Sequence, residues 1–312
     1  MTKVSDDLFI ETWKRIGVVK DIADELGVTE RNVYRRRDYL QKKYNIILEA
    51  SGKNKRYVNV KDYISRATAH IDNGVIMVAS DAHYWTDCIS PAHKAFVKLV
   101  KQIKPDFVVM NGDVFDGATV SRYPRQHWGV NKPPTVKQEL EAVSDRLYEI
   151  EKVAGNAKLI WTLGNHDQRF ESKLVTTAPE YEGIPGFSLK DHFPRWIHCM
   201  SLMINDDLMI KHRYRSSIHA TYLNTLHSGV SIVTGHLHRL QATIFSDYKG
   251  TRWGVDTGTL AEIDGDHMGY GEDDPKNHCS GFAVLTIVDG KLIQPELCAV
   301  MDGVAYFRGK AV

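Results

Sequence analysis

Five short apolar runs of the chain each end in side chains that can hold a metal ion or a proton. The polar residues that follow the runs are SDAH (80–83), NGDVFD (111–116), GNHD (164–167), His212 and GHLH (235–238). Asp, Asn and His form a hard-to-borderline ligand set, which suits Mn, Fe, Zn or Ni better than a thiolate zinc site would. The candidates are too numerous for one ion, so the pattern predicts a centre of two metal ions.

Two metal ions define a type of chemistry. Ions about 3.5–4 Å apart can clamp the attacking and the leaving oxygen of a phosphoryl transfer, and they lower the pKa of bound water toward about 7. A carboxylate such as Asp113 can bridge them. Glycine stands beside the candidates at Gly112, Gly164 and Gly235, where it would let the backbone turn sharply and approach the ions closely.

The apolar runs themselves predict the elements that bring these side chains together. Buried strands are expected at 75–80, 107–110, 159–163, 208–212 and 230–235, and amphipathic helices at 91–104 and 135–153. Alternation of strand and helix indicates an α/β core, and ligands of such sheets gather beyond the carboxyl ends of the strands. The last stretch predicts a hairpin around Asp289-Gly290.

In this order, DAH, GDVFD, GNHD, a lone His and GHLH resemble the five signature blocks of the calcineurin-like metallophosphoesterases, including phage and bacterial members. The resemblance covers about residues 74 to 260. It implies a four-layer α/β/β/α sandwich over a domain spanning 72–312, with two sheets and helices on both outer faces. It also implies a phosphoesterase with two divalent ions. We expect Mn²⁺, with Fe, Zn or Ni as alternatives.

The resemblance also implies a role for each matching residue. One metal would be bound by Asp81, His83, Asp113 and His238, and the other by Asp113, Asn165, His212 and His236. His166 would protonate the leaving oxygen, Asp167 would orient and charge that imidazole, and Asp116 would be a partner of His83.

His212 departs from the family pattern, because Arg213 follows it where many relatives have glycine. His219 is an alternative ligand nearby. We favour His212, since it ends an apolar strand as the other candidates do.

The N-terminal segment, residues 1–66, has a different character. It contains 15 Lys and Arg against 10 Asp and Glu, a net charge of +5. Because the whole chain carries +1, residues 67–312 carry −4. Helices are expected at 6–16, at 19–26 and from Thr29 to about Tyr44, with Gly27 in the turn. ADELGVTERNVYRR resembles a helix-turn-helix, so we expect DNA contacts from Arg31, Asn32, Arg35, Arg36, Lys42 and Lys43. Oligomerisation or protein docking is the alternative. Residues 59–74 read as a connector.

Substrate contacts are expected near the metal centre. Arg169 could neutralise a substrate phosphate, or form a surface ion pair. The insert at 117–134 offers Arg122 and Tyr123, which suit a phosphate and a stacked base but could equally pack within the loop.

Three functions remain open. The first is a DNA nuclease, endo- or exo-acting, that is tethered to DNA by its N-terminal domain. The second is a phosphatase or phosphodiesterase of small nucleotides or phosphoproteins, and the third is a DNA-binding regulator whose phosphoesterase-like domain senses a ligand. No apolar run approaches the ~20 residues of a membrane helix, no secretory signal is visible, and the four cysteines form no CxxC pair. We therefore expect no membrane partner and a cytoplasmic location. If a phage encodes the protein, the expected location is the cytoplasm of the host. The oligomeric state is left open.

Overall fold

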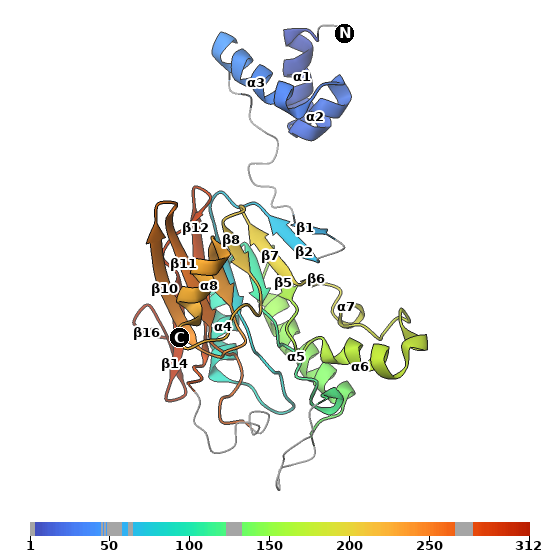
Figure 1. Ribbon diagram of the computed structural model, residues 1–312, viewed down its shortest axis with the longest axis vertical. Coiled ribbons are helices and arrows are strands. Elements are labelled where there is room, and N and C mark those ends of the chain that lie inside the picture. Colours follow the sequence, from blue (N-terminus) through green and yellow to red (C-terminus); the bar gives the residue numbers. More distant parts are fainter. Residues whose placement is uncertain are drawn as a thin grey trace. The chain divides into compact units, whose positions relative to one another are not determined.

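The computed structural model describes residues 4–44, 46, 48, 58–61, 65–122, 133–265 and 277–312 (Figure 1). The chain divides into two compact units, Met1–Tyr57 and Val58–Val312. Tyr123, an expected substrate contact, lies outside the described residues, as does most of its insert.

The first unit consists of three helices, as its sequence pattern predicts: α1 (Asp6–Ile16), α2 (Val19–Leu26) and α3 (Glu30–Tyr44). Gly27 ends α2 with a left-handed backbone, φ +62°. The Thr29 hydroxyl accepts a hydrogen bond of 3.3 Å from the amide of Asn32 at the start of α3. The buried side chains of Trp13, Val33 and Leu40 belong to its apolar core.

The second unit contains two sheets. In one, the parallel strands β3 (Gly74–Ala79), β4 (Phe107–Met110), β5 (Lys158–Thr162) and β6 (Ile197–Cys199) are joined through β3 to an antiparallel half. That half contains β12 (Gly281–Val288), β13 (Lys291–Leu292), β14 (Glu296–Met301), β15 (Val304–Phe307) and β16 (Lys310–Ala311). The expected hairpin at Asp289-Gly290 joins β12 to β13, and both residues have positive φ.

The other sheet has the order β1-β2-β7-β8-β9-β11-β10. Its strands are β1 (Val58–Lys61), β2 (Arg66–Ala69), β7 (Ser201–Ile204), β8 (Leu208–Ile210), β9 (Ser231–Thr234), β10 (Leu240–Asp247) and β11 (Gly250–Thr257). β1 and β2 lie in the segment that we expected to be a connector. The buried residues of β2 are Ala67 and Ala69, whose small side chains give almost no apolar signal in the sequence.

Helices cover both outer faces. α4 (Pro91–Ile103) and α5 (Val136–Val153) share an apolar core with the first sheet, and α8 (Ala220–Ser228) packs on β9, β10 and β11 of the second (Figure 1). A separate core, which includes Ile76, Val109 and Ile210, lies between the sheets. The predicted four-layer sandwich is therefore confirmed. Short helices α6 (Arg169–Thr177), α7 (Leu189–His192), η1 (Ala118–Val120) and η2 (Pro179–Tyr181) lie in connections. None of the helices in the described parts of the chain is both apolar and long enough to cross a bilayer.

Candidate metal centre

The predicted metal ligands come from both sheets. Asp81 and His83 follow β3, Asp113 follows β4 and Asn165 follows β5, all in the first sheet, whereas His212 follows β8 and the two histidines of GHLH follow β9 in the second. Parallel strands that end at one edge bring the residues after them together. The two sheets thus meet at a cluster that neither sheet could form alone.

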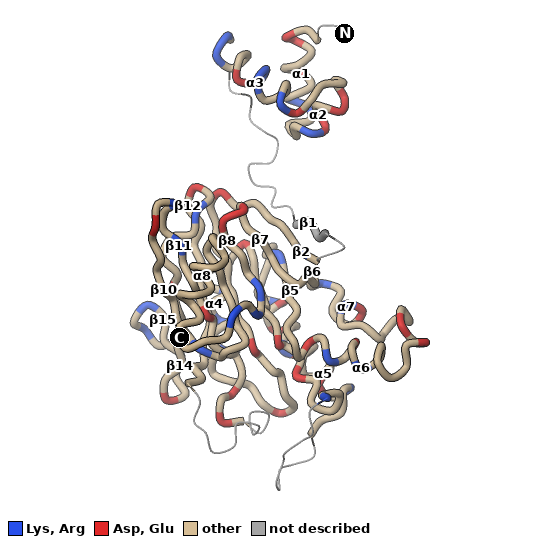
Figure 2. The backbone as a smooth tube through the Cα atoms, in the orientation of Figure 1, with Lys and Arg blue, Asp and Glu red and all other residues tan. Residues whose placement is uncertain are grey.

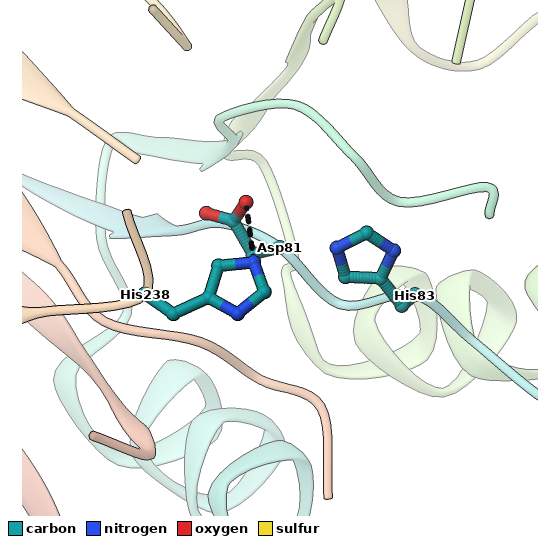
Figure 3. Close-up of side chains that lie close together, drawn as sticks. All are labelled: Asp81, His83 and His238. Atoms are coloured by element: carbon teal, nitrogen blue, oxygen red, sulfur yellow. Dashed lines mark ion pairs between the residues drawn. The ribbon is translucent and has the colours of Figure 1, made fainter. Parts of the chain in front are cut away.

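One group of potential ligands consists of Asp81, His83 and His238 (Figure 3). Their ligand atoms all lie within 4.8 Å of one another, and all three side chains are buried. Asp81 Oδ1 is 3.2 Å from His238 Nε2. These are three of the four residues that were expected to hold one metal.

A second group consists of Asp113, His212 and His236. Asp113 Oδ2 lies 3.0 Å from His212 Nε2, and the same nitrogen is 3.9 Å from Asp81 Oδ1, so the two groups adjoin. The structure therefore places His212 in the cluster. His219, the alternative, is exposed and precedes α8.

The donor atoms of these groups fit divalent ions. Among the described residues, His83 Nε2 and Asn165 Oδ1 are buried without a hydrogen-bond partner. Burying a polar atom unpaired is costly, so such atoms usually have a bound partner. Asn165 lies between Gly164, which packs on Asp113, and His166, whose amide donates to Asp113 Oδ1 at 2.8 Å.

The charges of the centre are strongly coupled. Burial by itself lowers the pKa of His212, but the carboxylates of Asp113 and Asp81 outweigh it and raise that pKa to about 10. Burial raises the pKa of Asp113, yet the positive charge on His212 and His166 brings it well below its ordinary value. An imidazole must be neutral to bind a metal, so metal binding here would release protons.

The backbone at the ligands is strained. Asp81, His83, Asp113, His236 and His238 all have positive φ, between 39° and 72°. Residues other than glycine seldom adopt this conformation, and each instance costs about 1–3 kcal/mol. Strain of this kind gathers where function requires a particular side-chain direction. No feature of the sequence marks it, apart from the tolerance of Asp, Asn and His for left-handed backbone.

Glycine is required at the three positions that were expected to pass close to ligands. A Cβ on Gly112 would collide with the His212 ring, and one on Gly164 would collide with the Asp113 carboxylate and amide. One on Gly235 would collide with the side chains of Ser80 and Asp81. The close approach expected beside the ligands is therefore present at all three.

Asp116 connects the proposed proton donor to the metal ligands. Its Oδ1 lies 2.9 Å from His83 Nδ1 and 2.9 Å from His166 Nδ1. The other ring nitrogen of His166, Nε2, faces away from Asp116 and lies 3.9 Å from Asp113 Oδ2. The pKa of Asp116 is lowered well below its usual range, because hydrogen bonds from both histidines outweigh its burial.

The role expected for Asp167 needs correction. Its carboxylate accepts hydrogen bonds from the amides of Asp113, Val114, Phe115 and Gly164 and from the indole of Trp161, at 2.8–3.0 Å. The imidazole of His166 instead has Asp116 as its carboxylate partner. Asp167 therefore fixes the loops after β4 and β5 and does not orient the imidazole directly.

We expect Asp167→Ala to lower the free energy of unfolding by at least about 3 kcal/mol, because each buried donor left unsatisfied costs about 1–3 kcal/mol. Urea titration followed by tryptophan fluorescence would measure it, with the exposed Asp264→Ala as control. A fully stable protein with reduced turnover would instead support the role that we first expected.

Arg169 lies at the start of α6 beside the proposed proton donor. Its Nη2 is 2.9 Å from His166 Nε2, and its Nη1 donates to the Asp116 carbonyl at 2.8 Å. Nη1 also lies 4.0 Å from Asp116 Oδ2, so the guanidinium contacts both the imidazole of His166 and Asp116. Arg122 is exposed at the end of the described part of its insert.

Glu139 is a site-supporting residue that the sequence reasoning missed. It is fully buried on α5 and accepts the amides of Gly117 and Ala118 at 2.7 and 3.1 Å, directly after Asp116. Burial, together with the charge of Asp116, raises its pKa to about 8. The sequence did contain a signal that Glu139 is buried, because it stands four residues before Val143 and therefore on the apolar face of the helix.

Comparison with known proteins finds one family and several solved structures that are similar to this chain. Residues 74–253 match the calcineurin-like phosphoesterase family. Similar solved structures include Vps29 with bound zinc from Entamoeba histolytica (13% identity, 76% of this chain and 98% of that one, TM-score 0.40). Another is the phosphoesterase YfcE from E. coli (16% identity, 71% of this chain and 97% of that one, TM-score 0.33). A third is a dimetal phosphatase from Danio rerio (9% identity, 76% of this chain and 97% of that one, TM-score 0.32). No curated protein matched the sequence.

The two-sheet fold and the clustered Asp and His side chains define a metal-dependent phosphoesterase that uses divalent ions. The match covers more than half of the chain, which therefore belongs to the calcineurin-like phosphoesterase family.

Proposed function

We propose that this phosphoesterase is a nuclease that hydrolyses phosphodiester bonds of DNA, with its N-terminal unit as the DNA anchor. Two divalent ions, for which we propose manganese, would be held by Asp81, His83, Asp113, Asn165, His212, His236 and His238. Such ions neutralise phosphate charge and activate water. A tether raises the local concentration of substrate without altering the site.

The protein's own residues have separate tasks in this reaction. Asp116 holds His166 Nδ1 and so fixes the ring orientation. In this structure Arg169 donates to the other ring nitrogen, Nε2. During the reaction the guanidinium turns to the substrate phosphate and offsets its charge, and Nε2, once protonated, donates its proton to the leaving oxygen.

The exposed face of α3 is the observation that favours DNA over a small ester. Arg31, Asn32, Arg35 and Lys42 are exposed on this helix, which follows the short glycine turn. Figure 2 shows in blue the Lys and Arg positions along α3. Such a helix can enter the major groove, with cationic side chains on phosphates and an Asn on base edges.

Two of the expected DNA contacts have partners within the unit. Arg36 is half-buried, pairs with Asp6 at 3.0 Å and lies over the ring of Phe9. Lys43 pairs with the same carboxylate at 2.7 Å. The proposed DNA face is therefore narrower than the sequence pattern indicates, because Asp6 at the start of α1 draws these two cations toward it.

The test compares Arg31→Ala/Arg35→Ala with Lys14→Ala/Lys20→Ala, which removes two exposed cations from α1 and α2. With Mn²⁺ present, we expect the arginine variant to bind duplex DNA at least about 10-fold more weakly and to show a shallower salt dependence. The lysine variant should match the unmodified protein, and both should hydrolyse a small chromogenic diester normally.

Other outcomes would favour the remaining functions. Hydrolysis of small esters with no cleavage of single- or double-stranded DNA would indicate a phosphatase or nucleotide phosphodiesterase. Sequence-specific DNA binding with no turnover in any divalent metal would indicate a regulator.

A further inference from the structure

The segment after β8 carries a group of exposed cations that the metal chemistry does not use. Residues 211–219, KHRYRSSIH, form a loop, here called the basic loop, that begins with Lys211 and includes the ligand His212. Arg213, Tyr214 and Arg215 are exposed. No Asp or Glu occurs anywhere from residue 208 to residue 246, so the charge of this loop has no compensating carboxylate in its own part of the sequence.

The arginines of this loop are unpaired in the part of the chain that the structure describes: neither Arg213 nor Arg215 forms a salt bridge with a carboxylate there. Lys211 Nζ and the Arg215 guanidinium lie 5.3 and 5.8 Å from the centre of the Tyr214 ring. Cations grouped around an exposed aromatic ring are typical of surfaces that bind a phosphate backbone and stack a base.

The basic loop is held in place by the body of the domain. The amide of Arg215 donates to the side chain of the buried Asn224 at 3.1 Å, and Arg239 Nη1 donates to the Ser217 carbonyl at 2.8 Å. At its start, the amide of Lys211 donates to the Val233 carbonyl at 3.1 Å. A loop that is already ordered loses little conformational entropy on binding a ligand.

The loop is also close to the metal centre. Arg213 is the residue directly after the ligand His212, whose ring centre lies 5.3 Å from that of His236. Arg169 stands beside His166, which follows β5 of the other sheet. Cations therefore flank the centre on the side of each sheet.

We infer that the basic loop binds the phosphates of a single-stranded polynucleotide next to the bond that is cleaved, with a base stacked on Tyr214. This inference rests on the proposed nuclease function and specifies its substrate. A single small ester would occupy only the metal ligands, His166 and Arg169. Arg213 and Arg215 extend the positive surface beyond that first phosphate, which only a chain of phosphates can use.

The test uses the full-length protein with Mn²⁺ and two substrates, a labelled 20-nucleotide oligo(dT) and a small chromogenic phosphodiester. For Arg213→Ala/Arg215→Ala, we expect KM for the oligonucleotide to rise at least about 10-fold. The slope of log KM against log salt concentration should also fall by about 1.4, because each of the two lost phosphate contacts contributes about 0.7 on a single strand. Tyr214→Leu should raise the same KM without changing the salt slope. An oligo(U) arm shows whether RNA serves equally.

The matched control is Lys94→Ala/Lys98→Ala, which removes two exposed cations of α4. If the arginine variant has the KM and salt slope of this control, the inference is overturned while the nuclease proposal survives. If it loses hydrolysis of the small diester in parallel, the loop only supports His212, and the inference is again overturned. If the unmodified protein hydrolyses the small diester but cleaves no polynucleotide, the nuclease proposal itself fails.

Discussion

We expect the Asp113→Ala protein to lose both its divalent metal and its phosphoesterase activity. Asp113 belongs to one of the two adjoining ligand groups, with Oδ2 3.0 Å from His212 Nε2 and Oδ1 accepting the His166 amide. Residues that only support metal ligands already contribute 10–100-fold to affinity. Loss of a carboxylate ligand should therefore weaken metal binding by more than about 100-fold.

Metal content after dialysis, measured by mass spectrometry, and turnover of a small diester would test this expectation. Asp113→Asn keeps the shape of the side chain and tests whether charge is what matters. Asp145→Ala, at an exposed position of α5, is the control and should keep its metal. An Asp113→Ala protein with full metal content would refute the assignment of this ligand.

His166→Ala should behave differently, because it should keep its metal and lose the proton donor. General acid catalysis contributes about 10²–10⁴-fold. We expect kcat to fall by that factor for substrates with an alkoxide leaving group, such as DNA. The loss should be much smaller for a nitrophenyl ester, whose leaving group departs without protonation.

The ratio of the two losses is the measurement that matters here. Equal losses on both substrates would show that His166 acts on the phosphate or on the metals and not on the leaving oxygen. Adding Arg169→Ala to the comparison separates charge neutralisation from proton donation, since its loss should affect both esters alike.

Much of the site could be predicted from the sequence because strand ends are readable. Apolar runs followed at once by Asp, Asn or His located the residues that the structure brings together at Asp81, Asp113 and His212. The alternation of strands and helices indicated the α/β class, but assignment of the strands to two sheets came from the family resemblance. Periodicity alone does not show which strands pair.

The features that were missed depend on long-range contacts. Asp167 binds amides more than 50 residues away, and Glu139 binds amides that follow Asp116. Arg36 and Lys43 meet Asp6 only once α1 and α3 have packed together. A sequence reveals that such groups are polar, but the partner that satisfies them is known only from the fold.

The origin of the ligands from both sheets has a consequence for the way the chain assembles. Asp81 and His238 are 157 positions apart (238 − 81), yet they share one ligand group. An ion bound there acts as a cross-link that closes a very long loop, much as a disulfide would. Its binding energy is available only after the two sheets have docked, so that energy would add to the free energy of folding. A chain in a metal-starved cell would lack this contribution, and its less stable native state would be cleaved more readily by proteases.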